Sequence, residues 1–214
     1  MRENIQDEDE GFSIKKLFSD FLDLIESVIF SVFLVLLIFT YIFRISDVSG
    51  PSMLPTLKDN DRVIVLPFVS QIKQNDIVIV DTPKLTDEKT GKPGKLIVKR
   101  VIATEGQTVD IDFEKGIVSV DGVELDEQLY VPNPDGSSPE LKADHFVNTL
   151  TTINMGAFEN YPVKVEKGKV FVLGDNRNES KDSKHSALGF IPEEEVIGKV
   201  VFRVYPFNKI GFVN

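Results

Sequence analysis

The stretch Ser49-Gly50-Pro51-Ser52-Met53-Leu54-Pro55-Thr56-Leu57 separates an apolar segment before it from a series of β-type segments after it. Proline one residue before Ser52 and again three residues after it forces turned or extended backbone on both sides. A hydroxyl on such a stiff turn suits a catalytic nucleophile, and it equally suits an ordinary surface turn. Other parts of the sequence are needed to distinguish a catalytic nucleophile from a surface turn.

The segment before this turn is almost wholly apolar over residues 21–43. As a helix, a run of this length rises roughly 34 Å, enough to cross a bilayer. Asp23 and Glu26 lie one turn inside its start, where we expect them at headgroup level. A buried core helix is the alternative, whereas a cleavable signal peptide fits poorly because the run is too long and no A-x-A-like site follows.

We therefore predict three parts: a cytoplasmic tail over 1–20, a transmembrane anchor helix over 21–44, and an extracytoplasmic domain over 45–214. Lys15 and Lys16 precede the apolar run and Arg44 follows it, a balance that favours a cytoplasmic N-terminus. The predicted location is the cell membrane, crossed once, with the domain over 45–214 outside the cell. The lipid bilayer is thus a predicted partner, and we expect a monomer.

Composition excludes several classes of function. The chain of 214 residues carries a net charge of −10, which argues against nucleic acid as a partner because phosphate binding needs a basic face. It has no cysteine and only two histidines, His145 and His185, whose separation matches no zinc motif. No glycine-rich nucleotide-binding motif is present. We therefore predict no metal and no cofactor.

Short apolar runs with period-two alternation after Arg44 predict a mainly β domain, a distorted sandwich or barrel with one N-terminal transmembrane helix. Asn60-Asp61, Asn75-Asp76 and Asp121-Gly122 mark turns between the runs. We predict a loop over 82–95, a helical turn over 193–196 and a variable insertion over about 130–165. The predicted strands are 62–66, 76–80, 96–103, 108–113, 117–120, 123–125, 169–173 and 199–205.

Lys99 is the candidate base for a serine nucleophile, since histidine is scarce. It lies in the predicted strand 96–103, where alternation places it on the same face as Ile97 and Val101. Desolvation on an apolar face lowers the pKa of a lysine towards values at which the neutral amine exists. The alternative is a lysine that extends into solvent from the sheet edge or pairs with an acidic residue.

A polar cluster follows the predicted strand 169–173 and reads Gly174-Asp175-Asn176-Arg177-Asn178-Glu179-Ser180-Lys181-Asp182-Ser183-Lys184. Asp175 can form a charge-assisted pair with Arg177. Ser180 and Ser183 supply small hydroxyls that could orient a lysine amine. By itself, the cluster is also typical of an exposed polar loop.

Together and in this order behind an N-terminal apolar span, the three stretches resemble bacterial type I signal peptidases (leader peptidases), most closely the Gram-positive members. The matching motifs are Ser-Met-x-Pro-Thr-Leu at 52–57, Lys-Arg-Val at 99–101, Gly-Asp-Asn-Arg-x-x-Ser-x-Asp-Ser at 174–183 and Gly-Phe-Ile-Pro at 189–192. The resemblance covers most of 21–207 and leaves 130–165 unmatched.

The resemblance implies a membrane-anchored serine endopeptidase that removes N-terminal signal peptides from secreted preproteins. Ser52 would be the nucleophile and Lys99 the general base of a Ser-Lys dyad. The signal peptide would bind as an added β-strand, with small residues in shallow pockets. The predicted substrate-binding residues are Val48, Gly50, Met53, Ile97 and Val98.

The resemblance also implies supporting roles within the polar cluster. Ser180 would orient the Lys99 amine, while Asp182 and the Asp175/Arg177 pair would stabilise the loop. At one position this chain departs from the family pattern: Lys184 replaces the usual arginine, which removes a planar fork.

The oxyanion site shows a second departure. The Ser52 N–H would donate to the oxyanion. Some members of the family add a side-chain hydroxyl two residues before the nucleophile, but here that position is Gly50. The Gly50 N–H or a neighbouring group would then have to supply the second donor.

Two other classes of protein share parts of this pattern. A non-catalytic scaffold or chaperone for surface-fibre (pilus) assembly could keep the fold, but it would be expected to lose Ser52 or Lys99, and both are present. A self-cleaving repressor with a Ser-Lys dyad would carry a DNA-binding domain in place of an anchor, and the acidic N-terminal tail provides none.

Overall fold

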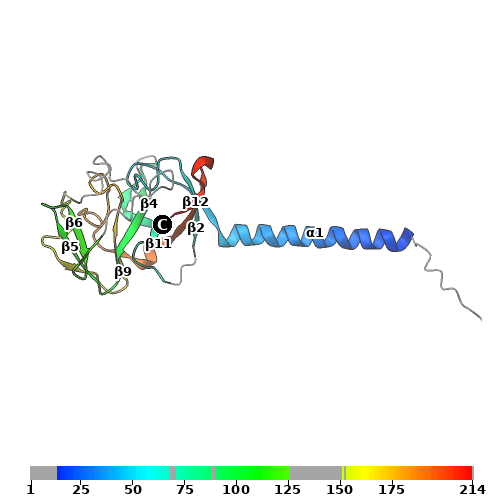
Figure 1. Cartoon of the computed structure of the whole chain (residues 1–214), viewed down its shortest axis with the longest axis horizontal. Helices are drawn as coiled ribbons and strands as arrows, with labels where there is room; N and C mark the ends of the chain where they lie inside the picture. The colour runs from blue at the N-terminus through cyan, green and yellow to red at the C-terminus, as the bar shows by residue number, and fades with distance from the viewer. Residues whose placement is uncertain (1–13, 68–70, 88–89, 126–150, 152, 214) are drawn as a thin grey trace, which may run out of the picture. The chain divides into compact units, whose positions relative to one another are not determined.

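The computed structural model describes residues 14–67, 71–87, 90–125, 151 and 153–213. The chain forms two compact units, Met1–Tyr41 and Ile42–Asn214. Helix α1 (Ile14–Ile42) lies in the first unit up to Tyr41, and the described strands all follow it in the second (Figure 1).

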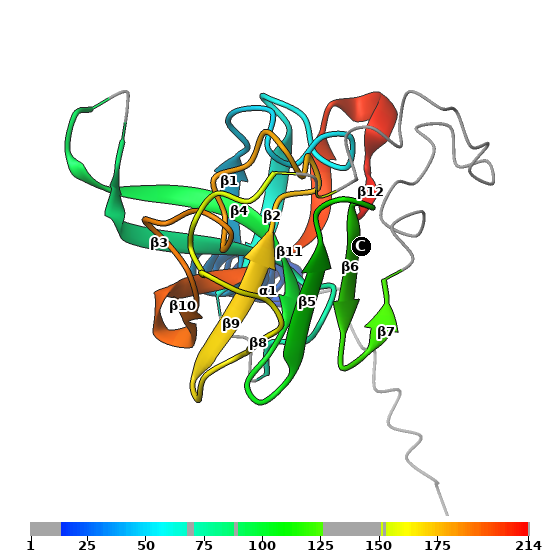
Figure 2. The same cartoon turned by 90° about the vertical axis from the view of Figure 1, so that its left-hand side faces the viewer.

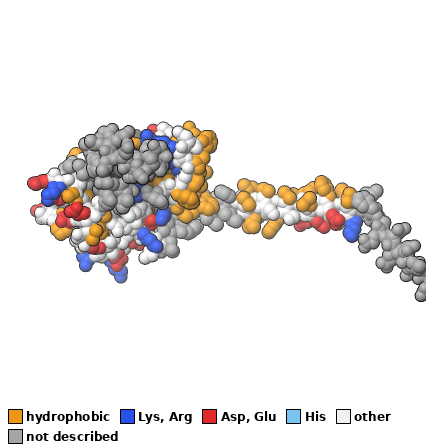
Figure 3. Space-filling model, viewed as in Figure 1, with side chains coloured by type: hydrophobic (Ala, Val, Ile, Leu, Met, Phe, Trp, Pro, Cys, Tyr) orange, Lys and Arg blue, Asp and Glu red, His pale blue; other side chains and the backbone are white. Residues whose placement is uncertain are grey.

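Helix α1 has 29 residues. Its large apolar side chains from Leu17 to Leu36 are exposed, and Figure 3 shows them along its length with charged side chains gathered near its start. Within the described residues, however, no helix combines the length and hydropathy needed to span a bilayer. A helix is thus present where the sequence predicts one over 21–44, but it begins at Ile14, within the predicted tail, and ends at Ile42, while Arg44 belongs to a strand. Its prediction as a transmembrane span is not confirmed.

The second unit is mainly β, as predicted, and its described strands pair antiparallel in two sheets (Figure 2). The larger sheet has the order β1-β2-β11-β3-β4-β9-β10, with β12 also paired to β11. Its strands are β1 (Arg44–Asp47), β2 (Arg62–Leu66), β3 (Ile77–Thr86), β4 (Pro93–Ala103), β9 (Lys169–Leu173), β10 (Ile191–Pro192), β11 (Val196–Tyr205) and β12 (Gly211–Phe212).

The smaller sheet has the order β7-β6-β5-β8. Its strands are β5 (Thr108–Asp112), β6 (Ile117–Val120), β7 (Val123–Glu124) and β8 (Val163–Lys164). Two 3-10 helices, η2 (Glu193–Glu195) and η3 (Phe207–Lys209), flank β11. The predicted helical turn over 193–196 therefore corresponds to η2.

Buried apolar side chains gather in clusters that hold the two predicted catalytic stretches in place. Met53 and Leu57, from the proline-framed turn, pack in the same cluster as Val63 and Val65 of β2. Ile97 of β4 packs in another cluster on the sheet. The turn is therefore anchored by its own apolar side chains rather than hanging free between β1 and β2.

The asparagine signals read from the sequence do mark turns. Asn60 and Asn75 both have positive φ, 67° and 74°. Each is followed by an aspartate, and the carboxylates of Asp61 and Asp76 accept hydrogen bonds from backbone N–H groups three residues earlier, at 3.0 Å in both cases. These side-chain bonds close the turns that lead into β2 and β3.

The predicted loop over 82–95 is wrong, because β3 extends to Thr86 and β4 begins at Pro93. The hairpin is held by register pairs that include Thr82 with Lys95, and the Thr82 hydroxyl donates to the Lys95 carbonyl at 2.6 Å. Strand β3 pairs with β11 at Val78, Ile79 and Val80 and at none of the later described residues of β3. Pro83 is therefore tolerated, because no backbone N–H is needed at this position to pair with β11.

The predicted insertion over about 130–165 lies largely outside the described residues, as does His145. Its final part is described and belongs to the fold: Val163 pairs with Val109 of β5. Phe158 and Tyr161 pack against the cluster of buried residues on the smaller sheet, which includes Val165.

Gly198 provides a test of the packing between β11 and β2. A Cβ at this position would lie 2.5 Å from the Leu66 carbonyl oxygen and 2.8 Å from Val65 Cγ1. We expect Gly198→Ala to lower the free energy of unfolding by about 1–3 kcal/mol, because the backbone must shift to accept the methyl group. Urea unfolding of the purified chain measures this change.

Gly211→Ala is the matched control, since a Cβ on Gly211 meets nothing within 4 Å. It should change the free energy of unfolding by less than about 0.5 kcal/mol. Equal losses in the two variants would contradict the described packing of β11 on β2.

Candidate active site

Ser52 lies on a compact turn between β1 and β2. The Leu54 N–H donates to the Pro51 carbonyl at 3.0 Å, and the Leu57 N–H donates to the Met53 carbonyl at 2.9 Å. Met53 is only 1% exposed and packs in a core cluster, and both Ser52 and Met53 line a pocket. The turn thus holds the hydroxyl at a fixed position on the surface of the domain.

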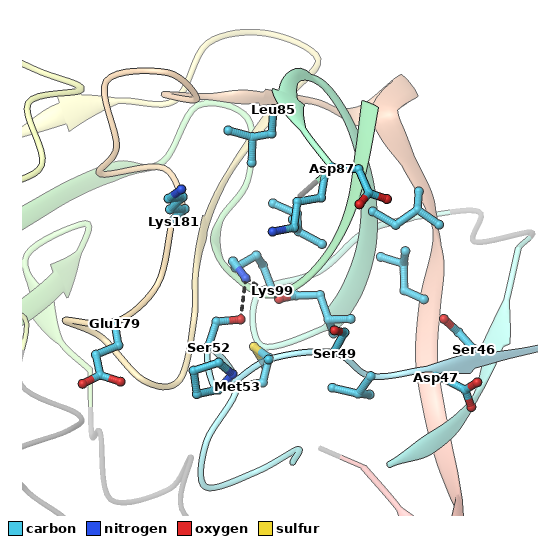
Figure 4. Close-up of a pocket in the computed structure, with 18 of the residues that line it drawn as sticks. Ser46, Asp47, Ser49, Ser52, Met53, Leu85, Asp87, Lys99, Glu179 and Lys181 are labelled. Atoms are coloured by element: carbon cyan, nitrogen blue, oxygen red, sulfur yellow. Dashed lines mark hydrogen bonds between the residues drawn. The ribbon is translucent and has the colours of Figure 1, made fainter. Parts of the chain in front are cut away.

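Lys99 reaches this hydroxyl from β4. Its Nζ donates to Ser52 Oγ at 2.8 Å and to the Val98 carbonyl at 2.7 Å. The side chain is buried, with the residue 2% exposed. Figure 4 shows the two side chains pointing toward each other, and both line the pocket. The structure thus brings together the two residues predicted as a dyad, and Lys99 does not extend into solvent.

The environment of Lys99 favours the neutral amine. Burial lowers the pKa of Lys99 from 10.5 to about 8, while the Asp182 and Asp175 carboxylates act in the opposite direction more weakly. Desolvation thus outweighs the nearby acids. A lysine with this pKa is partly neutral under mildly alkaline conditions and can then accept a proton from a hydroxyl.

The dyad opens into a pocket of about 550 Å³. The wall on one side comes from the stretch before Ser52 and on the other from the β3–β4 hairpin, with Leu85 and Leu96 among its apolar residues. Glu179 and Lys181 of the polar loop also line it (Figure 4). The five predicted substrate-binding residues all lie in its lining, namely Val48, Gly50, Met53, Ile97 and Val98.

The polar loop after β9 is attached to β4 by a buried ion pair. Arg100 donates through Nε and Nη2 to the two carboxylate oxygens of Asp175, both at 2.8 Å, and both side chains are 1% exposed. The sequence predicts Arg177 as the partner of Asp175, and the structure corrects this prediction, because Arg100 contacts both carboxylate oxygens. A bidentate pair fixes direction as well as distance, which orients the start of the loop.

The end of the loop is closed by a second buried pair. Lys184 Nζ donates to both oxygens of Asp182 at 3.1 Å and to the Arg177 carbonyl at 2.9 Å. Asp182 also accepts from the Gly174 N–H at 3.1 Å. Lysine in place of arginine therefore still contacts both carboxylate oxygens, and Asp182 ties the two ends of the loop together.

The two loop serines have different surroundings. Ser183 Oγ accepts the Val172 N–H at 2.9 Å and thereby extends the contacts of β9. Ser180 Oγ is buried and has no hydrogen-bond partner among the described residues. A Cβ on Gly174 would overlap both Ser180 Oγ and the Ser52 carbonyl oxygen, so glycine at 174 lets the loop approach the nucleophile turn closely. An orienting role of Ser180 toward Lys99 remains a prediction.

The Gly50 N–H is not available as an oxyanion donor. It donates to the Asp59 carboxylate at 2.8 Å, and Gly50 adopts φ 90°. The suggestion that this N–H supplies the second donor is therefore wrong. The reason is a local one: the carboxylate of Asp59 folds back over the turn and takes the hydrogen bond.

Sequence reasoning missed Arg100, which lies directly beside the candidate lysine. The signal was nevertheless present, since Arg100 alternates with Val98 and Ile102 in an apolar strand. An arginine at such a position requires a carboxylate partner, because an unpaired buried charge is costly.

Known proteins match this chain over most of its length. The model of the family described as signal peptidase, peptidase S26 matches residues 21–205. Signal peptidase I T of Bacillus subtilis is 33% identical over 92% of this chain and 91% of that protein. A signal peptidase I of Bacillus licheniformis is 36% identical over 87% of this chain and 89% of that protein.

Among solved structures, a signal peptidase I from Enterococcus faecalis is 24% identical, with a TM-score of 0.41, and the match covers 62% of this chain and 98% of that one. The assignment depends on the family model and the Bacillus relatives, which each extend over far more than half of the chain. The chain belongs to the signal peptidase family, peptidase S26.

Proposed function

We propose that this peptidase is a membrane-anchored serine endopeptidase that removes N-terminal signal peptides from secreted preproteins with a Ser52–Lys99 dyad. The observation that carries the proposal is the 2.8 Å contact between Lys99 Nζ and Ser52 Oγ, made by a lysine that is 2% exposed. The signal peptidase I relatives support the substrate class.

The reaction is acyl transfer through a covalent intermediate. Neutral Lys99 takes the proton of Ser52, and the Ser52 oxygen attacks the scissile carbonyl carbon. The Lys99 ammonium then returns the proton to the leaving amine as the peptide bond breaks. Water attacks the ester that remains on Ser52, with Lys99 again accepting a proton, and the signal peptide leaves as a carboxylic acid.

The substrate is proposed to add as a strand along β4. Residues 95–99 of β4 pair with β3 on one side, while pairing with β9 begins only at Arg100 on the other. The second edge of β4 is thus without a strand partner among the described residues just where it borders the pocket. An extended peptide on that edge would place its carbonyl near Ser52 and its side chains in the pocket.

Membrane anchoring is proposed for helix α1. Residues 27–43 contain no charged side chain, and those described up to Leu36 leave their large apolar side chains exposed. Nine residues lead from Phe43 to Ser52, and they span at most about 32 Å. An anchored helix would therefore keep the dyad near the membrane surface, where the signal peptide of a preprotein is presented, with the N-terminus in the cytoplasm.

The dyad is tested by substitution. Ser52→Ala and Lys99→Ala should each reduce cleavage of a signal-peptide substrate by at least about 1,000-fold, since the nucleophile or its base is gone. Lys99→Arg should be equally inactive, because arginine stays charged. Cleavage by the detergent-solubilised chain is followed by mass spectrometry.

Lys167→Ala is the matched control, since Lys167 is exposed and lies outside the pocket, and it should leave the rate unchanged. Substantial cleavage by Lys99→Arg would rule out the dyad.

The pH dependence of kcat/KM tests the role of the amine. With a Lys99 pKa of about 8, the active neutral form is lost as pH falls. The value of kcat/KM should therefore rise about tenfold per pH unit below pH 8 and level off above it. A rate that keeps rising to pH 10 would show that the base is an ordinary exposed lysine.

Anchoring by α1 is tested by extraction of cell membranes at alkaline pH. The full chain should stay in the membrane pellet after carbonate treatment, because the exposed apolar side chains of α1 favour lipid over water. A chain lacking residues 14–43 should move to the supernatant. Release of the full chain under the same treatment would contradict an integral anchor.

A further inference from the structure

Asn176 holds the nucleophile turn through two of its own groups. Its backbone N–H donates to the Ser52 carbonyl at 3.1 Å, and its side-chain Nδ2 donates to the Pro51 carbonyl at 3.2 Å. The residue is 3% exposed. Because the Pro51 carbonyl can only accept a hydrogen bond, the amide NH₂ rather than the amide oxygen has to face it.

These two contacts fix the peptide planes on both sides of Ser52. The Pro51 carbonyl and the Ser52 N–H belong to one planar peptide group and point in opposite directions. A donor that holds the carbonyl therefore also sets the direction of the N–H. The Ser52 carbonyl belongs to the next peptide plane, so Asn176 restrains the backbone before and after the serine.

Asn176 is itself held by its neighbours. Asp175 precedes it and is fixed by the buried pair with Arg100. Asn176 Nδ2 also donates to Glu179 Oε2 at 3.4 Å, and the Glu179 N–H donates to the Asn176 carbonyl at 3.2 Å. The amide is thus positioned from β4 and from within the loop, and it transmits that position to the turn.

We infer that Asn176 is a positioning residue for catalysis, one that directs the Ser52 N–H toward the oxyanion formed on the scissile carbonyl. The inference rests on the proposed peptidase function and adds a residue to it. It explains why the polar loop approaches the serine turn so closely that position 174 has no room for a Cβ. Oxyanion stabilisation depends on donors that are oriented before the reaction occurs.

The test compares Asn176→Ala and Asn176→Asp with the wild type in the full, detergent-solubilised chain. Alanine removes the side-chain donor to the Pro51 carbonyl and keeps the backbone N–H that donates to the Ser52 carbonyl. Aspartate keeps the shape of the side chain but faces the Pro51 carbonyl with a second acceptor. Removal of an oxyanion donor costs about 100- to 1,000-fold in kcat, so a misdirected donor should cost about 10- to 100-fold. KM should stay within about twofold, because the contacts are to the enzyme backbone and not to the substrate.

A peptide aldehyde provides a second readout. The Ser52 oxygen adds to the aldehyde carbon, the carbonyl electrons move to the oxygen, and the Ser52 proton passes to Lys99. Inhibition by the aldehyde should weaken in both variants by about the same factor as kcat, since the adduct needs the same donor. In Asn176→Ala the pH at which kcat/KM rises should not move, because this variant adds no charge near the Lys99 amine, whereas a new carboxylate in Asn176→Asp should raise that pH, as Asp175 and Asp182 raise the pKa of Lys99. Asn208→Ala, an exposed position in η3, is the matched control and should match the wild type.

The outcomes separate this inference from the proposed function. Wild-type kcat and aldehyde inhibition in both Asn176 variants, while Ser52→Ala is inactive, would overturn the positioning role alone. A loss of kcat that is accompanied by a lower melting temperature in both variants, or failure of both variants to fold, would assign Asn176 a structural role. Either result would also overturn the positioning role. A wild-type chain that does not cleave the signal peptide, or an active Ser52→Ala variant, would remove the proposed function and this inference with it.

Discussion

The contact between a buried amine and a hydroxyl is the interaction on which the site depends. Lys99 Nζ lies 2.8 Å from Ser52 Oγ, and burial lowers its pKa to about 8. Keeping such a lysine away from water costs about 3 kcal/mol relative to an ordinary one. Asp182 and Asp175 raise the pKa of Lys99 less than burial lowers it, and Lys184 and Arg100 each form a close ion pair with one of these carboxylates. The charges of the loop are therefore largely balanced among themselves, and the amine is left to its apolar surroundings.

Strand β4 links the three sequence stretches because consecutive residues serve different partners. Lys99 reaches the serine turn, while Arg100, on the opposite face, reaches Asp175 in the polar loop. Lys99 and Arg100 contact different stretches because neighbouring side chains of a strand point to opposite faces of the sheet. The loop then contacts the serine turn directly through Asn176. Each stretch is thus held by the other two, so a shift in any one of them changes the geometry at Ser52.

Sequence reasoning predicted those features that depend on local pattern. The strands over 62–66, 117–120 and 169–173 have the predicted bounds, because alternation and flanking turn residues define them. Sequence reasoning failed where a contact involves residues far apart in the chain. The Asp175 carboxylate pairs with Arg100, 75 residues away, and not with nearby Arg177 as predicted. Likewise, the Asp59 carboxylate accepts the hydrogen bond of the Gly50 N–H. The β3–β4 hairpin extends past Pro83 because β3 pairs with β4 along one edge, and this pairing is enough to continue the strand. The Ser-Lys chemistry, the substrate and the bilayer crossing stay predictions that follow from the residues and the family resemblance.

Direct titration of Lys99 tests the central claim most sharply. In protein labelled with 13C-lysine, the Cε resonance that disappears in Lys99→Arg belongs to Lys99, and its chemical shift reports protonation of the amine. We predict a midpoint near pH 8, well below that of the exposed lysines. A midpoint at the ordinary lysine value of about 10.5 would mean that the amine stays charged beside Ser52 and cannot act as its base.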